Sequence, residues 1–319
     1  MENMTSNTRL MASHMLFSPE TNNLVLLQSP SEIQSSIPEN STTFSSASTN
    51  QLSSIQSGRN TKKRKFCLKV VSYNLIVDDQ LQALAQKYDI HREFVERLRV
   101  LQDYEIVIIC DDSGSMKTFV DNGNRTRWDE LCEITKIVLE IGTIFDSNGV
   151  DLFFLNRCSY FRIKDPREVD QAFSISPSGY TPLVTALRSA IGLPAARYGN
   201  DKKLLIFVAT DGEPTDYEGT PNLSEFEHVM GNERNPETTH VMFLLCTDEP
   251  DSVEHFTQWD QTMKNVDVTD DFPTEREKIR RYRGPAFRFS RGDYVVKALI
   301  GAVDPEIDKL DEPIPLNSN

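Results

Sequence analysis

The chain has 319 residues, with 48 Asp and Glu against 34 Lys and Arg, which gives a formal net charge of −14. So acidic a surface repels phosphate backbones, and the composition therefore argues against a general nucleic-acid binder. The sequence contains no run of 18 apolar residues that would span a membrane, and its start lacks the pattern of a secretory signal. Five widely spaced cysteines without a CxxC pair favour reduced thiols, so we expect an intracellular protein.

The first 65 residues differ in composition from the rest. Ser, Thr and Asn together occupy 27 of the first 60 positions. Such a segment cannot bury enough apolar area to offset about 1–2 kcal/mol of backbone entropy per residue, so residues 1–65 are predicted to be a disordered tail. The basic cluster Lys62-Lys63-Arg64-Lys65 fits either a solvated linker or a nuclear-import signal. We therefore expect a cytoplasmic location, with the nucleus as the alternative.

Two shorter segments flank the part of the chain that is typical of a folded domain. Residues 66–103 carry apolar side chains at helical spacing and are predicted to form a short helical preface. The residues that show this spacing are Leu81, Leu84, Ala85, Tyr88, Phe94, Val95 and Leu98. At the other end, residues 304–319 are rich in Pro and Asp, and we expect a flexible tail there.

Residues 104–303 alternate between apolar runs and amphipathic stretches. Continuous apolar runs rich in β-branched residues predict strands that are covered on both faces, and they occupy residues 105–110, 204–209 and 241–246. A fourth run, residues 151–156, is interpreted as a strand at an edge of the sheet. Amphipathic helices are predicted where apolar residues recur every three or four positions, in residues 128–141, 183–191 and 294–303. The alternation predicts a Rossmann-like, doubly wound α/β domain with a mostly parallel sheet.

Polar residues directly follow two of the predicted strands. The first run is followed by Asp111-Asp112-Ser113-Gly114-Ser115, and the second by Thr210-Asp211-Gly212-Glu213. Parallel strands end at the same edge of a sheet, where open α/β sheets bind ligands, so we expect both turns to lie at one rim. Between them in sequence, a loop that contains Thr181 opens a helix. The candidate ligand residues are Asp111, Ser113, Ser115, Thr181 and Asp211.

The chemistry of these five side chains favours a hard divalent cation. All of them offer oxygen, and none offers sulfur or imidazole, which suits Mg²⁺ or Mn²⁺ and argues against zinc or copper. Ser113 and Ser115 are two positions apart, and we expect Gly114 to permit the sharp bend that brings their hydroxyl groups together. Hydroxyl groups and a few carboxylates leave coordination positions for water and for one ligand from outside the chain.

The three elements D-x-S-x-S, G-x-T-P-L and T-D-G, in this order and after the predicted strands, resemble the von Willebrand factor type A (VWA) domain with its metal-ion-dependent adhesion site. The resemblance covers about residues 104–303. It implies that Ser113, Ser115 and Thr181 contact the metal, and that Asp111 and Asp211 bind it directly or through water. It also implies that a partner's carboxylate completes the coordination. On this resemblance, we expect an intracellular protein–protein interaction module that binds a partner's Asp or Glu side chain through Mg²⁺ or Mn²⁺.

Further residues of the same turns are expected around the ligand set, either behind it or on the surface that meets the partner. They are Asp112, Gly114, Tyr180, Gly212 and Glu213. Asp112 is interpreted either as an extra carboxylate that raises the affinity for cations or as a cap of the following turn. Tyr180 stands where the family usually has a smaller residue, so we expect it to line the rim.

A metal-dependent hydrolase that acts at the same acidic rim is the alternative function. The sequence has no G-x-S-x-G, no phosphate-cradling G-x-x-x-x-G-K-[ST] and no G-x-G-x-x-G, and no histidine is near the rim in sequence. A general base would therefore have to be a carboxylate. We favour the binding module over the enzyme, and the sequence indicates no oligomeric state.

Overall fold

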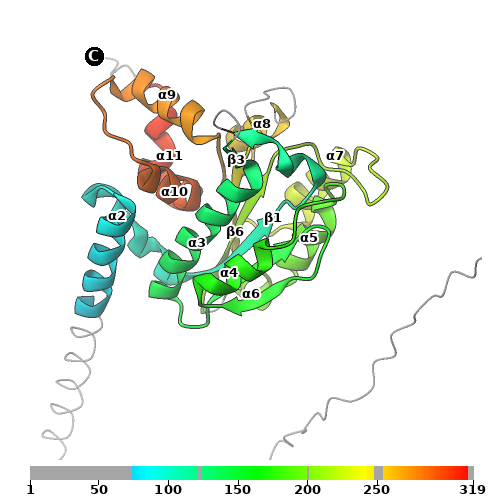
Figure 1. The fold of residues 1–319 in the computed structure, drawn as a ribbon, viewed down its shortest axis with the longest axis horizontal. Helices are drawn as coiled ribbons and strands as arrows, with labels where there is room; N and C mark the ends of the chain where they lie inside the picture. The colour runs from blue at the N-terminus through cyan, green and yellow to red at the C-terminus, as the bar shows by residue number, and fades with distance from the viewer. Residues whose placement is uncertain (1–73, 121–123, 200, 248–253, 315–319) are drawn as a thin grey trace, which may run out of the picture. The chain divides into compact units, whose positions relative to one another are not determined.

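The computed structural model describes residues 74–120, 124–199, 201–247 and 254–314 (Figure 1). The predicted tail of residues 1–65, with its basic cluster, lies outside the described residues. The main sheet contains β1 (Tyr104–Cys110), β4 (Val150–Phe154), β5 (Tyr160–Ile163), β6 (Lys203–Thr210), β7 (Thr239–Leu245) and β8 (Val266–Thr269). A separate two-stranded ribbon contains β2 (Phe119–Val120) and β3 (Arg125–Thr126).

The six strands lie in the order β5-β4-β1-β6-β7-β8, and all neighbours pair in parallel except β4 and β5. The chain proceeds outward from β1 through β4 to β5, and then crosses to the other side of β1 for β6, β7 and β8. The reversal of direction falls between β1 and β6, and in open sheets of this kind ligands bind outside the carboxyl ends of the strands at such a point. The predicted doubly wound, mostly parallel α/β fold is confirmed.

Strands β1, β6 and β7 form the buried centre of the sheet, as their continuous apolar sequences predict. The prediction that the strand near residues 151–156 lies at an edge was wrong, because β5 pairs outside β4. Sequence reasoning also missed β5 and β8. Both are only four residues long, and polar residues interrupt their apolar pattern.

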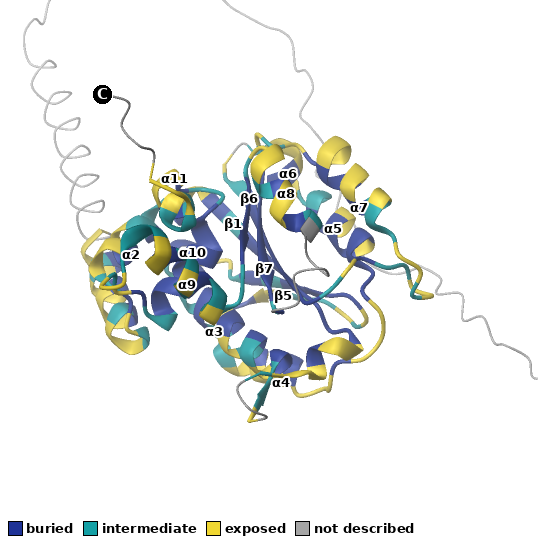
Figure 2. Cartoon of the chain, turned by 90° about the horizontal axis from the view of Figure 1, so that it is seen from above, coloured by how far each residue is buried: buried dark blue, intermediate teal, exposed yellow. Residues whose placement is uncertain are grey.

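Helices cover both faces of the sheet (Figures 1 and 2). One face packs against α3 (Arg127–Phe145), α4 (Pro166–Phe173) and α10 (Arg291–Ile300). The other packs against α5 (Leu183–Ile191), α6 (Pro194–Tyr198), α7 (Leu223–His228) and α8 (Glu254–Thr262). Side chains alternate along a strand, so Ile108 belongs to the first core and Ile109 to the second. Figure 2 shows the central strands in the buried colour and the outer helix surfaces exposed.

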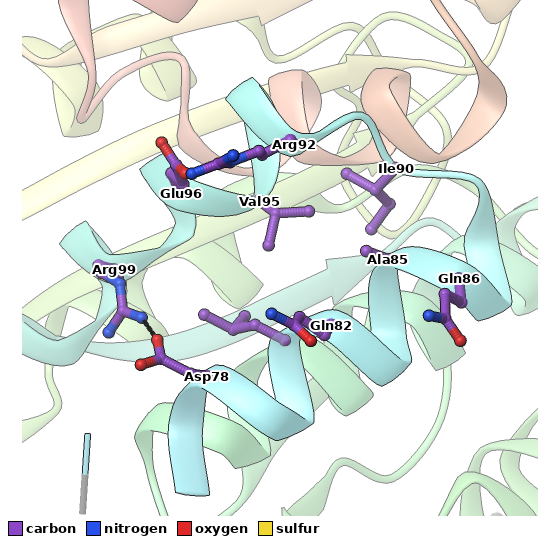
Figure 3. A pocket seen from close by; sticks show the side chains of 10 residues that line it. Asp78, Gln82, Ala85, Gln86, Ile90, Arg92, Val95, Glu96 and Arg99 are labelled. Carbon is purple, nitrogen blue, oxygen red and sulfur yellow. Dashed lines mark hydrogen bonds and ion pairs between the residues drawn. The ribbon is translucent and has the colours of Figure 1, made fainter. Parts of the chain in front are cut away.

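The predicted helical preface is helical in its described residues and packs into the first core. It contains residues 74–88, α2 (Arg92–Arg97) and the 3₁₀ helix η1 (Leu98–Asp103). Its backbone is tied to α10 because the His91 N–H donates to Asp293 Oδ1 at 2.7 Å. A groove of about 760 Å³ runs between residues 74–88 and α2, and the ion pair of Arg99 with Asp78 lies at one end of it (Figure 3).

The remaining described elements lie in the turns and near the C-terminal end. They are η2 (Gly114–Lys117), the π-helical turn η4 (Val229–Glu233), α9 (Phe272–Arg283), α11 (Pro305–Asp308) and η6 (Lys309–Asp311). The prediction of a flexible tail from residue 304 was wrong for its first part. Asp304 caps α11 and pairs with Arg97 at 2.8 Å, and Ile307 is buried in the first core. None of the described helices is long and apolar enough to cross a membrane.

Candidate metal centre

Asp111 begins the site directly after β1. Its backbone N–H donates to the Ala209 carbonyl at 2.9 Å, which continues the β1–β6 pairing by one residue. The side chain is fully buried, and both oxygens are held: the Ser113 N–H donates to Oδ1 at 2.8 Å and the Thr210 hydroxyl to Oδ2 at 2.7 Å. The carboxylate therefore has a defined orientation between the two strand ends.

A chain of hydrogen bonds joins the two predicted turns. The Ser113 and Ser115 hydroxyl oxygens lie 2.9 Å apart, and the Ser115 hydroxyl donates to Asp211 Oδ1 at 2.8 Å. Ser115 and Asp211 are 96 positions apart in sequence. The structure thus brings three of the predicted ligand side chains within hydrogen-bonding distance, with Asp111 bonded to the backbone of the first.

The bend between the two serines has a different origin from the predicted one. Gly114 opens the 3₁₀ turn η2, its φ is not in the left-handed region, and an added Cβ would meet only Gly179 O at an ordinary 3.8 Å. The 3₁₀ turn itself brings the serines together. The glycine that the loop requires is Gly179, which has φ +107°, and its Cβ would lie 2.5 Å from Asn156 Oδ1.

The loop that carries Thr181 is bonded to both acidic turns. The Gly114 N–H donates to Gly179 O at 3.1 Å, and the Ser178 N–H donates to Asp112 O at 2.7 Å. On the other side, the Thr181 N–H donates to the Thr215 hydroxyl at 2.9 Å. Thr181 is buried at this junction. These backbone hydrogen bonds therefore position Thr181 between the first and third elements of the motif.

Arg127 belongs to the site, and sequence reasoning missed it. It is the first residue of α3, its side chain is only 7% exposed, and its guanidinium donates to Asp211 Oδ2 and to the Thr247 hydroxyl at 2.8 and 2.9 Å. Its ion-pair partner is not one of the acidic residues Asp129 and Glu130 of the same helix. Asp129 instead forms a capping box with Thr126. No local pattern marked Arg127 as buried, because its partner comes from β6.

The two buried carboxylates of this rim, Asp111 and Asp211, need positive charge nearby to stay ionised. Burial, together with the negative charge of Asp211, raises the pKa of Asp111 from 3.8 to about 7, although hydrogen bonds from Thr210 and Ser113 oppose the shift. Arg127 neutralises one oxygen of Asp211 and leaves the other facing Ser115. The donor set consists of carboxylate and hydroxyl oxygens, so the residues present fit Mg²⁺ or Mn²⁺.

Asp112 has a structural role: of its two predicted places, it lies behind the ligand set and not on the surface that would meet a partner. Its side chain is fully buried; Oδ1 accepts hydrogen bonds from the backbone N–H groups of Leu155 and Asn156, and Oδ2 pairs with Arg157 at 2.6 Å. It therefore joins the end of β1 to the end of β4. The idea that Asp112 caps its own turn was wrong, because the N–H groups that it accepts from follow a different strand.

The other residues predicted around the ligand set lie at the surface of the rim. Tyr180 is 53% exposed and its ring fills the space beside Gly219, where an added Cβ would lie 2.5 Å from the ring. Glu213 is exposed, and Gly212 is half-buried next to Asp211. Their role toward a partner stays a prediction.

The titratable groups that hydrogen-bond to the five ligand residues, within the described part of the chain, are carboxylates and Arg127. The described histidines make their hydrogen bonds and ring contacts elsewhere: they are His91, His228, His240 and His255. Cys246 follows β7 close to the rim, but burial raises the pKa of its thiol well above the usual value. Its thiol therefore stays protonated and is a poor nucleophile.

Comparison with protein-family models and with curated proteins finds no match for this chain.

Proposed function

We propose that this chain is a protein-interaction module that captures an acidic side chain of a partner protein through Mg²⁺ or Mn²⁺. The cation would be held by the five rim residues, which are Asp111, Ser113, Ser115, Thr181 and Asp211. The observation that carries the proposal is the hydrogen-bonded chain from Ser113 through Ser115 to Asp211 at the carboxyl ends of β1 and β6. The resemblance of the three motif elements to the VWA domain supports it.

When bound, the cation supplies a positive charge that a partner's carboxylate can bind. The rim offers surface for the rest of such a partner, since Tyr180 is half-exposed and Glu213 is exposed. A cavity of about 610 Å³ also opens beside the site, and its lining includes Arg127, Phe119 and Phe272. Phe119 is 64% exposed there, which gives a partner an apolar contact next to the acid-binding position.

The first test measures the cation alone. Titration calorimetry of the full chain with MgCl₂ or MnCl₂ is expected to show binding that Asp111→Ala abolishes. The matched control is Glu213→Gln, which removes an exposed carboxylate from the same turn as Asp211 and should leave cation binding intact. Mg²⁺ should also raise the melting temperature of the wild-type chain, because a ligand that binds only the folded state stabilises it. Absence of both effects would refute the proposal.

The second test measures recognition of a carboxylate. Pairs of immobilised peptides that differ only by Glu or Gln at one position should capture the chain differently. The Glu peptide should retain the chain in Mg²⁺ and release it when EDTA is added. The Asp211→Asn variant should lose this difference. Capture that ignores both the metal and the Glu-to-Gln change would contradict the proposed mode of binding. If the chain instead turned over a phosphorylated or acylated substrate with the same dependence on metal and Asp211, the hydrolase would replace the binding module.

A further inference from the structure

A second group of carboxylates lies away from the rim, where α8, β8 and α11 meet. Asp260 comes from α8, Asp267 from β8 and Asp308 from α11, and one oxygen of each lies within 4.8 Å of the others. Asp267 is 2% exposed, whereas the other two are partly exposed. The group therefore has a buried floor and an opening to solvent.

Asp267 is an unpaired buried carboxylate. Its Oδ1 accepts a hydrogen bond from the Val268 N–H at 2.7 Å, but its Oδ2 has no hydrogen-bond partner. Gly301, at the end of α10, makes room for that oxygen, because an added Cβ at this position would overlap with it. Leaving a buried acceptor unsatisfied costs about 1–3 kcal/mol, and more when the acceptor is charged. The Oδ2 atom of Asp267 is therefore available to bind a ligand.

The nearest buried ammonium group forms its ion pairs with other carboxylates. Lys297 is fully buried, and its Nζ lies 3.2 Å from Glu275 and 3.2 Å from Asp311. None of the ion pairs formed within the described ranges involves Asp260, Asp267 or Asp308. The three carboxylates of the group therefore lack an ion-pair partner among the described residues.

The carboxylates of the group are buried close enough together to repel one another. Burial, and then the charge of Asp267, raises the pKa of both Asp260 and Asp308 from 3.8 to about 7. Burial also raises the pKa of Asp267, although Lys297 opposes the shift. A bound divalent cation would remove the repulsion and keep all three carboxylates ionised.

We propose that Asp260, Asp267 and Asp308 form a second cation site, which binds Ca²⁺ and fastens α11 to the edge of the sheet at β8. The ligand set favours calcium over magnesium. Ca²⁺ takes six to eight oxygen ligands in a flexible geometry, whereas Mg²⁺ is usually held by one or two carboxylates and keeps several waters. The partly exposed Asp260 and Asp308 give the ion a path of entry and leave room for water in its coordination.

The test isolates this site from the rim by using the full chain with Asp111→Ala. Calorimetry with CaCl₂ should show one bound ion in this background, and adding Asp308→Asn should weaken the binding by roughly tenfold or more. The matched control, Glu306→Gln, removes an exposed carboxylate from the same short helix and should leave binding unchanged. MgCl₂ should bind at least roughly tenfold more weakly than CaCl₂.

Several results would overturn this assignment. They are an absence of Ca²⁺ binding in the Asp111→Ala background, binding that survives Asp308→Asn, or equal affinity for Mg²⁺. Should Asp308→Asn not fold, Asp260→Asn on α8 provides the same comparison. If these variants raise the melting temperature in EDTA and Ca²⁺ does not bind, the carboxylates only repel one another and no site exists. Because the rim is disabled throughout, failure here leaves the proposed function untouched, and the reverse also holds.

Discussion

Replacing Arg127 by Met removes a buried guanidinium from Asp211 while it keeps an unbranched side chain of similar reach. In the wild-type chain the Arg127 side chain is 7% exposed and Asp211 is fully buried, with 2.8 Å between the paired atoms. The change leaves the Asp211 carboxylate buried without its counter-charge. It also removes the hydrogen bond that Arg127 donates to the Thr247 hydroxyl at 2.9 Å.

The magnitude follows from this burial. Removing one partner of a buried ion pair costs about 3–5 kcal/mol, because the other charge stays desolvated. A folded unit of this size loses about 2–4 °C of melting temperature per kcal/mol, so metal-free Arg127→Met should melt about 6–20 °C lower than wild type. Arg92→Met is the matched control, since Arg92 is 91% exposed and lies 2.7 Å from Glu96. Exposed pairs of this kind contribute only about 0–1 kcal/mol.

The assay is thermal unfolding of both variants in EDTA and again in MgCl₂. On the proposed function, Mg²⁺ should raise the melting temperature of Arg127→Met by more than it raises that of the wild type, since the cation replaces the missing counter-charge of Asp211. Equal melting temperatures for Arg127→Met and Arg92→Met in EDTA would refute the claim that the guanidinium stabilises the rim. A variant that is destabilised but no longer responds to Mg²⁺ would show that Arg127 positions Asp211 rather than competing with the cation.

Two further predictions concern a buried histidine and the loop glycine. Burial lowers the pKa of His240 from 6.5 to about 4, so between these values the unfolded chain binds a proton that the folded chain does not, and stability must fall as the pH drops through this window. His240→Gln should remove up to about 1.4 kcal/mol per pH unit of that dependence in urea unfolding curves, and a curve that keeps its slope would disprove the assignment. Gly179 has φ +107°, and a Cβ added there would lie 2.5 Å from Asn156 Oδ1. Gly179→Ala should therefore destabilise the chain by about 1–3 kcal/mol and weaken cation binding, because the loop of the site must shift. Gly212→Ala, which has open space around its Cβ, should unfold like the wild type, and an equal loss in both alanine variants would contradict the argument.

The central strands and the two acidic turns were predictable because their signals are local. A parallel strand that is buried on both faces must be apolar along its whole length, so β1, β6 and β7 stand out in the sequence. Parallel pairing then requires that Asp111 and Asp211, one residue beyond neighbouring strands, come to the same edge. Short strands such as β8, in which a buried Asp alternates with Val, carry no comparable signal.

The roles of the charged side chains depend on partners that are distant in sequence. Arg127 and Asp211 are 84 positions apart, and Arg157 and Asp112 are 45 apart. Asp111 and Asp112 are adjacent and chemically identical, yet one faces the serines of the rim and the other ties down β4. Hydropathy and spacing do not distinguish them, because the pleat of the chain turns consecutive side chains to opposite sides.

The carboxylates of Asp260, Asp267 and Asp308 illustrate the same limit more sharply. They come from two helices and a strand, and no sequence motif links them. Only the folded chain brings their oxygens close together. The apolar pattern of the sequence reflects which side chains are buried away from water, and this pattern determines the layers of the sheet and helices. Electrostatic interactions depend on distance in space, so whether a given acid is a ligand, a cap or half of an ion pair was settled by the packing of those layers.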